Sequence, residues 1–242
     1  MLPLAKKIDK IQILMLYEVS KILCSSLALD QLALNRTLNQ VLELIATHLG
    51  MQRGMISLEQ EPGMLKTTSS IGLTHTEMQR AVFKIGEGIT GKIFQHGLPM
   101  VIPDIADEPL FLNKTGAYHH LENSKISFLG VPIKVGAQCI GVMSFQFEKA
   151  EHFAGFQTIL SLLNMVTRLI GQTVQLNQQI SRERQQLLLE NAQLQNELNK
   201  TYTLDNAIGK SKSMQEVFSK VHMAAPGNST ILLRGESGTG KK

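Results

Sequence analysis

The chain has 242 residues, of which 43% are hydrophobic, 18% are charged and only 5% are aromatic. This composition excludes fibrous, low-complexity and wholly disordered proteins, and the length allows one domain of ordinary size and part of a second. The net charge of +4 comes from residues 200–242, which hold seven Lys or Arg and three Asp or Glu, so residues 1–199 are neutral. A neutral first part without an evident basic reading helix argues against direct DNA binding by this chain.

Two cysteines, Cys24 and Cys139, lie far apart without CxxC spacing. This arrangement argues against a disulfide framework or a cysteine-ligated metal site, and we expect Cys139 to be a small core residue. The first residues lack the apolar run of a secretory signal, and no stretch approaches the roughly 18 apolar residues of a membrane span. We therefore expect a cytoplasmic protein without a membrane partner or a metal site.

The spacing of apolar residues predicts a succession of helices and strands. Helices are expected at 8–22, capped by Asp9 or a neighbour, at 31–49, at 74–82 and from 152 onward; strands are expected at 54–58, 64–70, 98–104, 126–135 and 138–148. The last two strands are separated only by Gly136-Ala137, which predicts a tight hairpin. The expected fold class is therefore α+β, with a largely antiparallel sheet flanked by helices.

Residues 86–91, GEGITG, match the GxGxxG pattern of dinucleotide-binding folds, and Asp104 follows the next strand. Such a site needs a crossover helix inside a parallel βαβ unit of about 30 residues, and the segment Lys92–Gly97 is too short to supply one. We therefore expect a turn that opens a helix rather than an NAD site.

The segment 105–125 has few apolar residues in any period and predicts a long loop, which is often a functional lid. It contains the adjacent pair His119-His120 and ends at Lys125. Together with Arg53, these residues are our candidates for binding an anionic metabolite in a pocket of the sheet. The alternative is that they are ordinary solvated side chains.

Beyond the sheet, apolar residues recur in alternating steps of four and three, which is the spacing of a coiled coil. This seam comprises Leu162, Val166, Leu169, Thr173, Leu176 and Ile180, and it resumes at Leu187, Asn191, Leu194 and Leu198. We expect a helical linker that forms a homodimer through residues 162–198. The alternative is a long amphipathic helix that packs on its own domain.

The last residues, ILLRGESGTGKK, predict a strand followed by a phosphate-binding loop. Its glycines allow backbone N–H groups to converge on phosphate oxygens, and its lysine reaches the β and γ phosphates. The predicted nucleotide-binding residues are Gly235, Glu236, Ser237, Gly238, Thr239, Gly240 and Lys241. Lys242 stands where a Ser or Thr would hold magnesium, and a Walker B acid is missing, so we expect no catalytic residues and no ATP hydrolysis in this chain.

Residues 207–242 resemble the opening of the AAA+ domain of bacterial sigma-54-dependent activators, whose first Walker motif typically reads GESGTGKE. Residues 86–116 and 127–147 resemble GAF domains, and are most similar to the sensory domains of nitrogen-fixation activators. The resemblance implies a GAF sensory domain at 1–175, a helical linker at 176–203 and the truncated start of an AAA+ sigma-54-interaction domain at 204–242.

In that family, ATP and Mg drive a central ATPase that remodels the sigma-54 RNA polymerase holoenzyme, and a C-terminal domain binds DNA. The regions for these contacts have no counterpart in this sequence, so we expect the chain to end inside its nucleotide site and to bind none of these partners itself. Its expected function is to regulate the ATPase in response to a small molecule or a regulatory protein. Two alternatives remain: a standalone dimeric GAF module or decoy, and a P-loop ATPase or kinase in its own right.

Overall fold

The computed structural model describes residues 2–25, 31–116, 125–148, 156–201 and 211–224, together with 232, 234 and 235. The helices are α1 (Leu2–Cys24), α2 (Gln31–Leu49), α3 (His75–Arg80), α4 (Gly88–His96), the 3-10 turn η1 (Ile105–Asp107), α5 (Phe156–Thr201) and α6 (Lys212–Ala224). The strands are β1 (Arg53–Glu61), β2 (Met64–Ile71), β3 (Val82–Lys84), β4 (Met100–Ile102), β5 (Ile126–Val135) and β6 (Gln138–Glu148). The expected α+β fold class is confirmed.

The strands form one six-stranded sheet in the order β3-β2-β1-β6-β5-β4. Every neighbouring pair is antiparallel, and β5 and β6 form the predicted hairpin around Gly136, whose φ of 60° suits glycine. The sequence interpretation missed β3, and its predicted helix at 74–82 overlaps this strand only at Val82. The helix begins after Thr74, which forms a capping box with Glu77, and it ends at Arg80. Val82–Lys84 are therefore free of the helix and pair with β2.

Two other helix ends bear on the sequence interpretation. α1 begins at Leu2, so Asp9 lies inside the helix and does not cap it; Pro3 is compatible with this start because the first turn needs no N–H from it. α2 ends at Leu49 as expected, and Gly50 follows with a φ of 64°.

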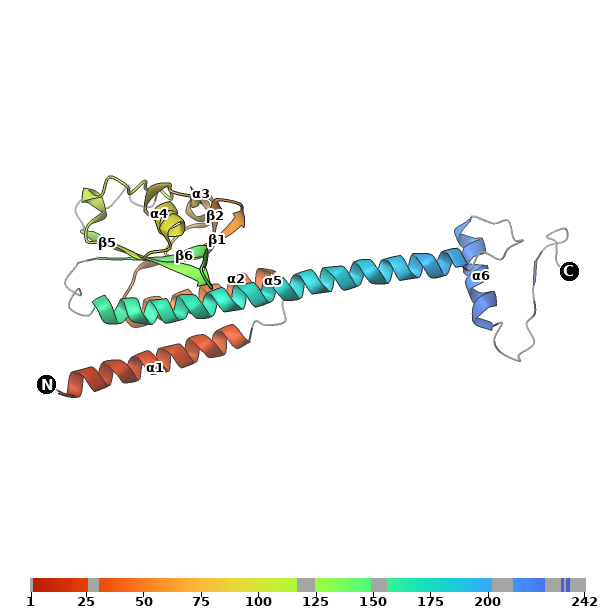
Figure 1. Ribbon diagram of the computed structural model, residues 1–242, viewed down its shortest axis with the longest axis horizontal. Coiled ribbons are helices and arrows are strands. Elements are labelled where there is room, and N and C mark those ends of the chain that lie inside the picture. The colour runs from red at the N-terminus through yellow and green to blue at the C-terminus, as the bar shows by residue number, and fades with distance from the viewer. Residues whose placement is uncertain are drawn as a thin grey trace. The chain divides into compact units, whose positions relative to one another are not determined.

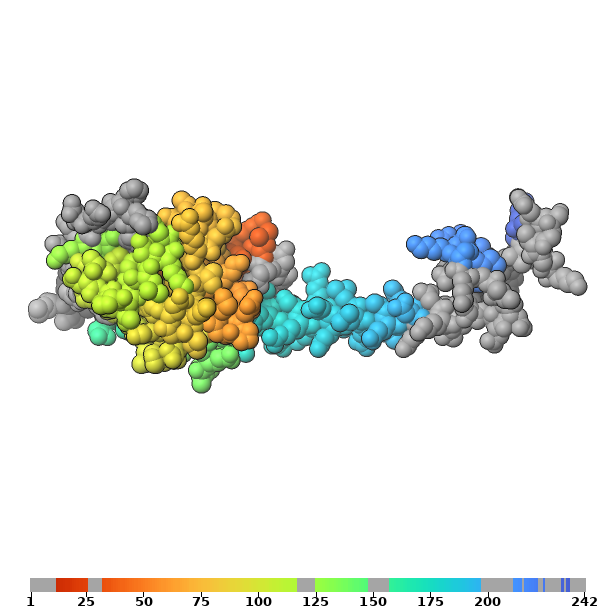
Figure 2. All heavy atoms as spheres, turned by 90° about the horizontal axis from the view of Figure 1, so that it is seen from above, coloured from red at the N-terminus to blue at the C-terminus, as the bar shows by residue number. Residues whose placement is uncertain are grey.

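The sheet separates two apolar layers. On one face, α1, α2 and α5 pack against alternate strand residues such as Ile56, Leu129 and Phe145 (Figure 1). On the other face, a smaller cluster that includes Met55, Phe83, Ile93, Phe128 and Val142 lies under α4 and η1. Figure 2 looks onto this second layer, where residues of about 50–116 form a continuous surface.

The first half of α5 belongs to the core of the sheet domain. Leu162, Val166, Ile170 and Val174 are at most 3% exposed and pack in the same cluster as α1 and α2. The seam predicted from Leu162 onward is therefore wrong in its first part, because Leu162 and Val166 are buried within their own chain. The alternative, a helix that packs on its own domain, holds there.

The chain divides into two compact units, Met1–Ser181 and Arg182–Lys242, with the boundary inside α5. In the second unit, all of residues 182–196 are exposed, and the exposed leucines of this stretch are Leu187, Leu188, Leu189 and Leu194. α6 begins after Ser211, whose hydroxyl accepts a hydrogen bond of 3.3 Å from the Met214 backbone N–H.

Candidate functional site

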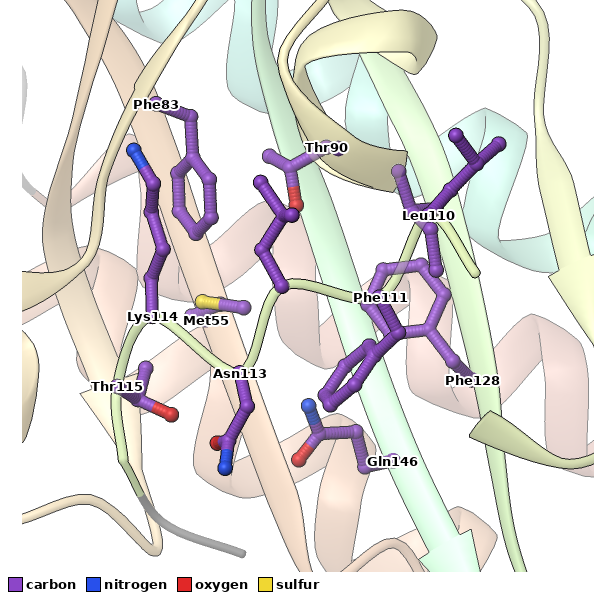
Figure 3. Close-up of a pocket in the computed structure, with 13 residues that line it drawn as sticks. Met55, Phe83, Thr90, Leu110, Phe111, Asn113, Lys114, Thr115, Phe128 and Gln146 are labelled. Atoms are coloured by element: carbon purple, nitrogen blue, oxygen red, sulfur yellow. The ribbon is translucent and has the colours of Figure 1, made fainter. Parts of the chain in front are cut away.

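A small cavity lies on the face of the sheet that carries α4 (Figure 3). Its volume is about 30 Å³, which is room for about one or two water molecules. The apolar residues of its wall include Met55, Phe83, Leu110, Phe111 and Phe128; the polar ones include Thr90, Asn113, Lys114 and Gln146. The cavity therefore combines an aromatic wall with a few polar groups, which is the usual make-up of a small-molecule site.

The register of three central strands builds the floor of the cavity. Gln146 of β6 pairs with Arg53 of β1 on one side and with Phe128 of β5 on the other. Since directly paired residues point to the same face of a sheet, these three side chains share the face under the cavity. Gln146 is only 8% exposed.

The cover of the cavity comes from the start of α4 and from the loop 108–116. Thr90, in the first turn of α4, is 4% exposed and its hydroxyl points toward the cavity (Figure 3). Gly91 allows this turn to lie directly against the Lys84 carbonyl, because a Cβ there would collide with backbone atoms. In the loop, Asn113 has a φ of 41°, a left-handed conformation that Asn tolerates better than most residues.

Lys114 fastens the loop to α4 and β3. Its ammonium lies 2.6 Å from Glu87 Oε1, donates a hydrogen bond of 2.9 Å to the Val82 carbonyl and sits 5.6 Å from the centre of the Phe83 ring. The hydrogen bond from Lys114, followed by one from the Lys84 backbone N–H, lowers the pKa of Glu87. These contacts form a latch, Glu87–Lys114, that keeps the loop over the cavity.

The polar groups of the cavity have unused hydrogen-bonding capacity. Asn113 Oδ1 is buried without a partner, and neither Gln146 nor Thr90 forms a side-chain hydrogen bond with any residue that the structure describes. A buried, unsatisfied amide oxygen costs about 1–3 kcal/mol. A ligand or water that donates a hydrogen bond to Asn113 would remove this cost, so the geometry fits a polar ligand.

Comparison with known proteins shows the family of the domain that contains this cavity. Residues 33–174 match the family described as GAF domain. The chain belongs to the GAF domain family. Residues 207–242 match a second family, the sigma-54 interaction domain.

Two relatives are named as regulators or proteins of nitrogen fixation. The chain is 46% identical over 232 residues to the Nif-specific regulatory protein of Herbaspirillum seropedicae, covering 96% of this chain and 42% of that protein. It is 33% identical over 232 residues to nitrogen fixation protein VnfA of Azotobacter vinelandii, covering 94% of this chain and 43% of that protein. The chain thus spans less than half the length of these relatives, and the resemblance to sigma-54-dependent activators of the nitrogen-fixation type is confirmed.

A solved structure agrees with the fold of the GAF domain. The crystal structure of the A. aeolicus nlh2 GAF domain, described as being in an inactive state, is 30% identical with a TM-score of 0.59. The match covers 70% of this chain and 98% of that chain.

The candidate ligand residues do not all meet at the GAF cavity. Arg53 lines a neighbouring cavity of about 10 Å³ that shares Met55, Thr115 and Gln146 with the first. Lys125 is exposed and lines neither of these two cavities, and His119 and His120 lie outside the described residues. The sequence interpretation missed Lys114. The spacing of Glu87 and Lys114 gave no signal that a loop residue would reach back to α4.

The other predicted features are resolved in part. α4 begins at Gly88 and is followed by β4, which is antiparallel to β5, so the helix-opening turn at GEGITG is confirmed. Cys139 is half-buried, donates a hydrogen bond of 3.3 Å to the Gly141 carbonyl, and has a pKa raised by burial, which fits a packing role. Of the predicted phosphate-binding loop, Gly235 is described and exposed, whereas Glu236, Ser237, Gly238, Thr239, Gly240 and Lys241 lie outside the described residues.

Two searches of the described residues were negative. None of the described helices is both long and apolar enough to cross a membrane. The described part of the chain also contains no group of three or more His, Cys, Asp or Glu residues that could hold a metal ion.

Proposed function

We propose that this chain is the sensory, regulatory N-terminal region of a cytoplasmic sigma-54-dependent activator of nitrogen-fixation genes. The observation that carries the proposal is the 46% identity to a Nif-specific regulatory protein along 96% of the chain. The proposed parts are a GAF sensory domain at 1–175, a helical linker at 176–203 and the start of a sigma-54 interaction domain at 204–242. Contacts with the sigma-54 holoenzyme and DNA belong to other regions of such a protein.

The sensory step takes place at the GAF cavity. A small anionic metabolite or a regulatory protein binds near Arg53 and the segment that contains His119, His120 and Lys125. Arg53, which lines the neighbouring cavity beside Gln146, supplies the positive charge for an anion, and the unsatisfied Asn113 amide oxygen would accept a hydrogen bond from a donor group of the same ligand. A ligand larger than water must displace the loop 108–116, because the present volume is about 30 Å³.

The signal passes through the strands to α5. Gln146 faces the cavity, and the preceding residue, Phe145, packs in the cluster that contains Ile170 and Val174 of α5. Because successive residues of a strand point to opposite faces, a shift of β6 under the ligand also shifts the surface that holds the helix.

Two copies of the chain pair through the linker. Leu187 and Leu194 are 59% and 51% exposed, and they lie in the stretch 182–196, in which every residue is exposed. Pairing through the part of the 162–198 seam that is not buried in the GAF domain would cover these leucines. Replacing Leu187, Leu194 and Leu198 with Ser should convert a dimer to a monomer in sedimentation equilibrium, whereas an unchanged mass would refute this part of the proposal.

The nucleotide site is incomplete in these residues. Backbone N–H groups of Gly235–Gly240 and the Lys241 ammonium suit a triphosphate, but Lys242 offers no oxygen ligand to magnesium. ATP supplies phosphoryl chemistry in the whole family, and residues 1–242 alone are not an enzyme. Turnover of ATP above that of a Lys241→Ala variant would contradict this.

A promoter assay tests the proposed function. Residues 1–203 replace the corresponding region of the Herbaspirillum seropedicae regulator, and transcription from a sigma-54-dependent nitrogen-fixation promoter is measured with and without fixed nitrogen. We expect the response to change with Gln146→Met, which removes a polar cavity group, and to persist in the control Gln138→Met, at an exposed position of the same strand. The proposal fails if deletion of 1–203 leaves both the output and its response unchanged.

A further inference from the structure

An open groove lies along α5, separate from the GAF cavity. It has a volume of about 510 Å³ and is formed by the turn after α4, the end of β5 and the first half of α5. The apolar side chains at its rim include Leu98 and Met165, which are 63% and 51% exposed. The groove is therefore a surface feature of the first unit that belongs neither to the GAF cavity nor to the proposed linker seam.

The groove carries positive charge without a counter-charge. Lys134 and Arg168 line it, and none of its described lining residues is Asp or Glu. Neither cation forms an ion pair with any residue that the structure describes. Asn164 also lines the groove; its backbone carbonyl accepts a hydrogen bond from Thr167 Oγ1, but its side-chain amide forms no hydrogen bond with a described residue.

The edge of the sheet beside the groove is open. β4 pairs with β5 only as far as Gly130, so Pro132 and Lys134 have no strand beside them on that side among the described residues. Pro132 lacks an N–H and so disfavours the addition of a partner strand at this edge. An occupant would therefore be recognised by side chains, through the two cations and the apolar rim.

We propose that this groove docks an acidic segment of a partner protein that carries a large apolar side chain between carboxylates. Charge complementarity decides against a second copy of this chain, because a twofold contact would bring the same cations of both copies together. Since α5 forms one wall, the bound segment would touch the helix directly. This second route to the linker does not need a ligand in the sheet pocket.

The test uses fluorescence polarisation with the full chain and a labelled peptide of sequence EDLFDE. We expect saturable binding that weakens about tenfold or more when the peptide is changed to its amide analogue QNLFNQ, or when both Lys134→Glu and Arg168→Glu are introduced. The matched control is Lys66→Glu, on an exposed position of β2, three strands away from β5 in the sheet, and it should change the affinity less than about twofold.

Two further measurements keep the result decisive. Thermal melting confirms that the variants are folded, and amide exchange with the peptide should slow in residues 160–170 and remain unchanged in 108–116. Absence of binding, or equal binding by the charge-reversed variant, overturns the proposal. A change of mass on charge reversal, in sedimentation without peptide, would instead identify a second copy as the occupant and would equally overturn it.

Discussion

Gly171 of α5 lies directly against the backbone of β5, and we expect Gly171→Ala to destabilise the GAF domain. A Cβ at this residue would lie well inside 3.0 Å of the Lys134 carbonyl oxygen, a separation that real Cβ atoms essentially never show. It would also lie 3.2 Å from the Lys134 carbonyl carbon and 3.5 Å from Val135 Cγ2. Because the obstacle is backbone, it cannot be relieved by a change of side-chain rotamer.

Two opposing effects set the size of the change. Alanine favours a helix by about 1 kcal/mol over glycine, so propensity alone would stabilise α5. Overpacking of a rigid contact costs about 1–3 kcal/mol, and here either the helix or the end of β5 must move by roughly half an ångström or more. The carbonyl contact places Gly171 at the upper end of that range, so we expect a net loss of about 1–2 kcal/mol.

Thermal unfolding followed by circular dichroism measures this loss. For a chain of this size, the expected decrease in melting temperature is roughly 2–8 °C. The control is Gln172→Ala, at the next residue, which is exposed and should keep or slightly raise the melting temperature. If Gly171→Ala raises the melting temperature as propensity alone predicts, then α5 does not lie against β5 as closely as described.

Two further predictions concern the latch and the two halves of α5. Glu87→Gln should cost about 1 kcal/mol at pH 7, measured by urea unfolding, because the Lys114 ion pair weakens. Since the folded-state pKa of Glu87 lies below its ordinary value of 4.5, this deficit should be present above pH 4.5 and vanish as the pH falls through the lower folded value; a deficit that does not shrink as the pH falls below 4.5 would refute the assignment. Ile170→Ala, at a fully buried site, should cost about 2–5 kcal/mol, whereas Leu188→Ala, at a site that is 62% exposed, should change stability by less than about 0.5 kcal/mol, and equal losses would show that both halves of α5 are packed alike.

Local sequence signals predicted most of the fold. The hairpin of β5 and β6 has the predicted bounds because a two-residue turn and two apolar runs define it without help from distant residues. β3 was not predicted because its three residues are too few for a period, and only pairing with β2 makes them a strand. The first half of α5 shows the reverse case. Its spacing suits a coiled coil and a domain core equally, and only the tertiary structure decides between them.

The candidate site was harder to predict. Arg53 could be chosen because a cation before a strand of the sheet is conspicuous, and it does line a cavity next to Gln146. Asn113 and Lys114 could not be chosen, because their roles depend on how the loop 108–116 folds back over the sheet. Gln146 lies in a strand that is buried on both faces, where period alone does not mark a polar residue as functional.

The sheet explains how one helix can report on a cavity that it does not touch. Gly54 has no side chain, and a Cβ there would lie 2.7 Å from Phe145 Cε1, so the Phe145 ring occupies the space next to β1 on the helical face. On the opposite face, Gln146 and Met55 of the same two strands line the cavity. If a ligand moved β6 relative to β1, the close contact of Phe145 with Gly54 would resist the movement, and the packed cluster that contains Phe145 and Ile170 would carry it to α5. A segment bound in the groove beside Lys134 would touch the same helix, so α5 would combine two inputs only if both shift it against the sheet, and the close contact of Gly171 with the Lys134 backbone would oppose such a shift.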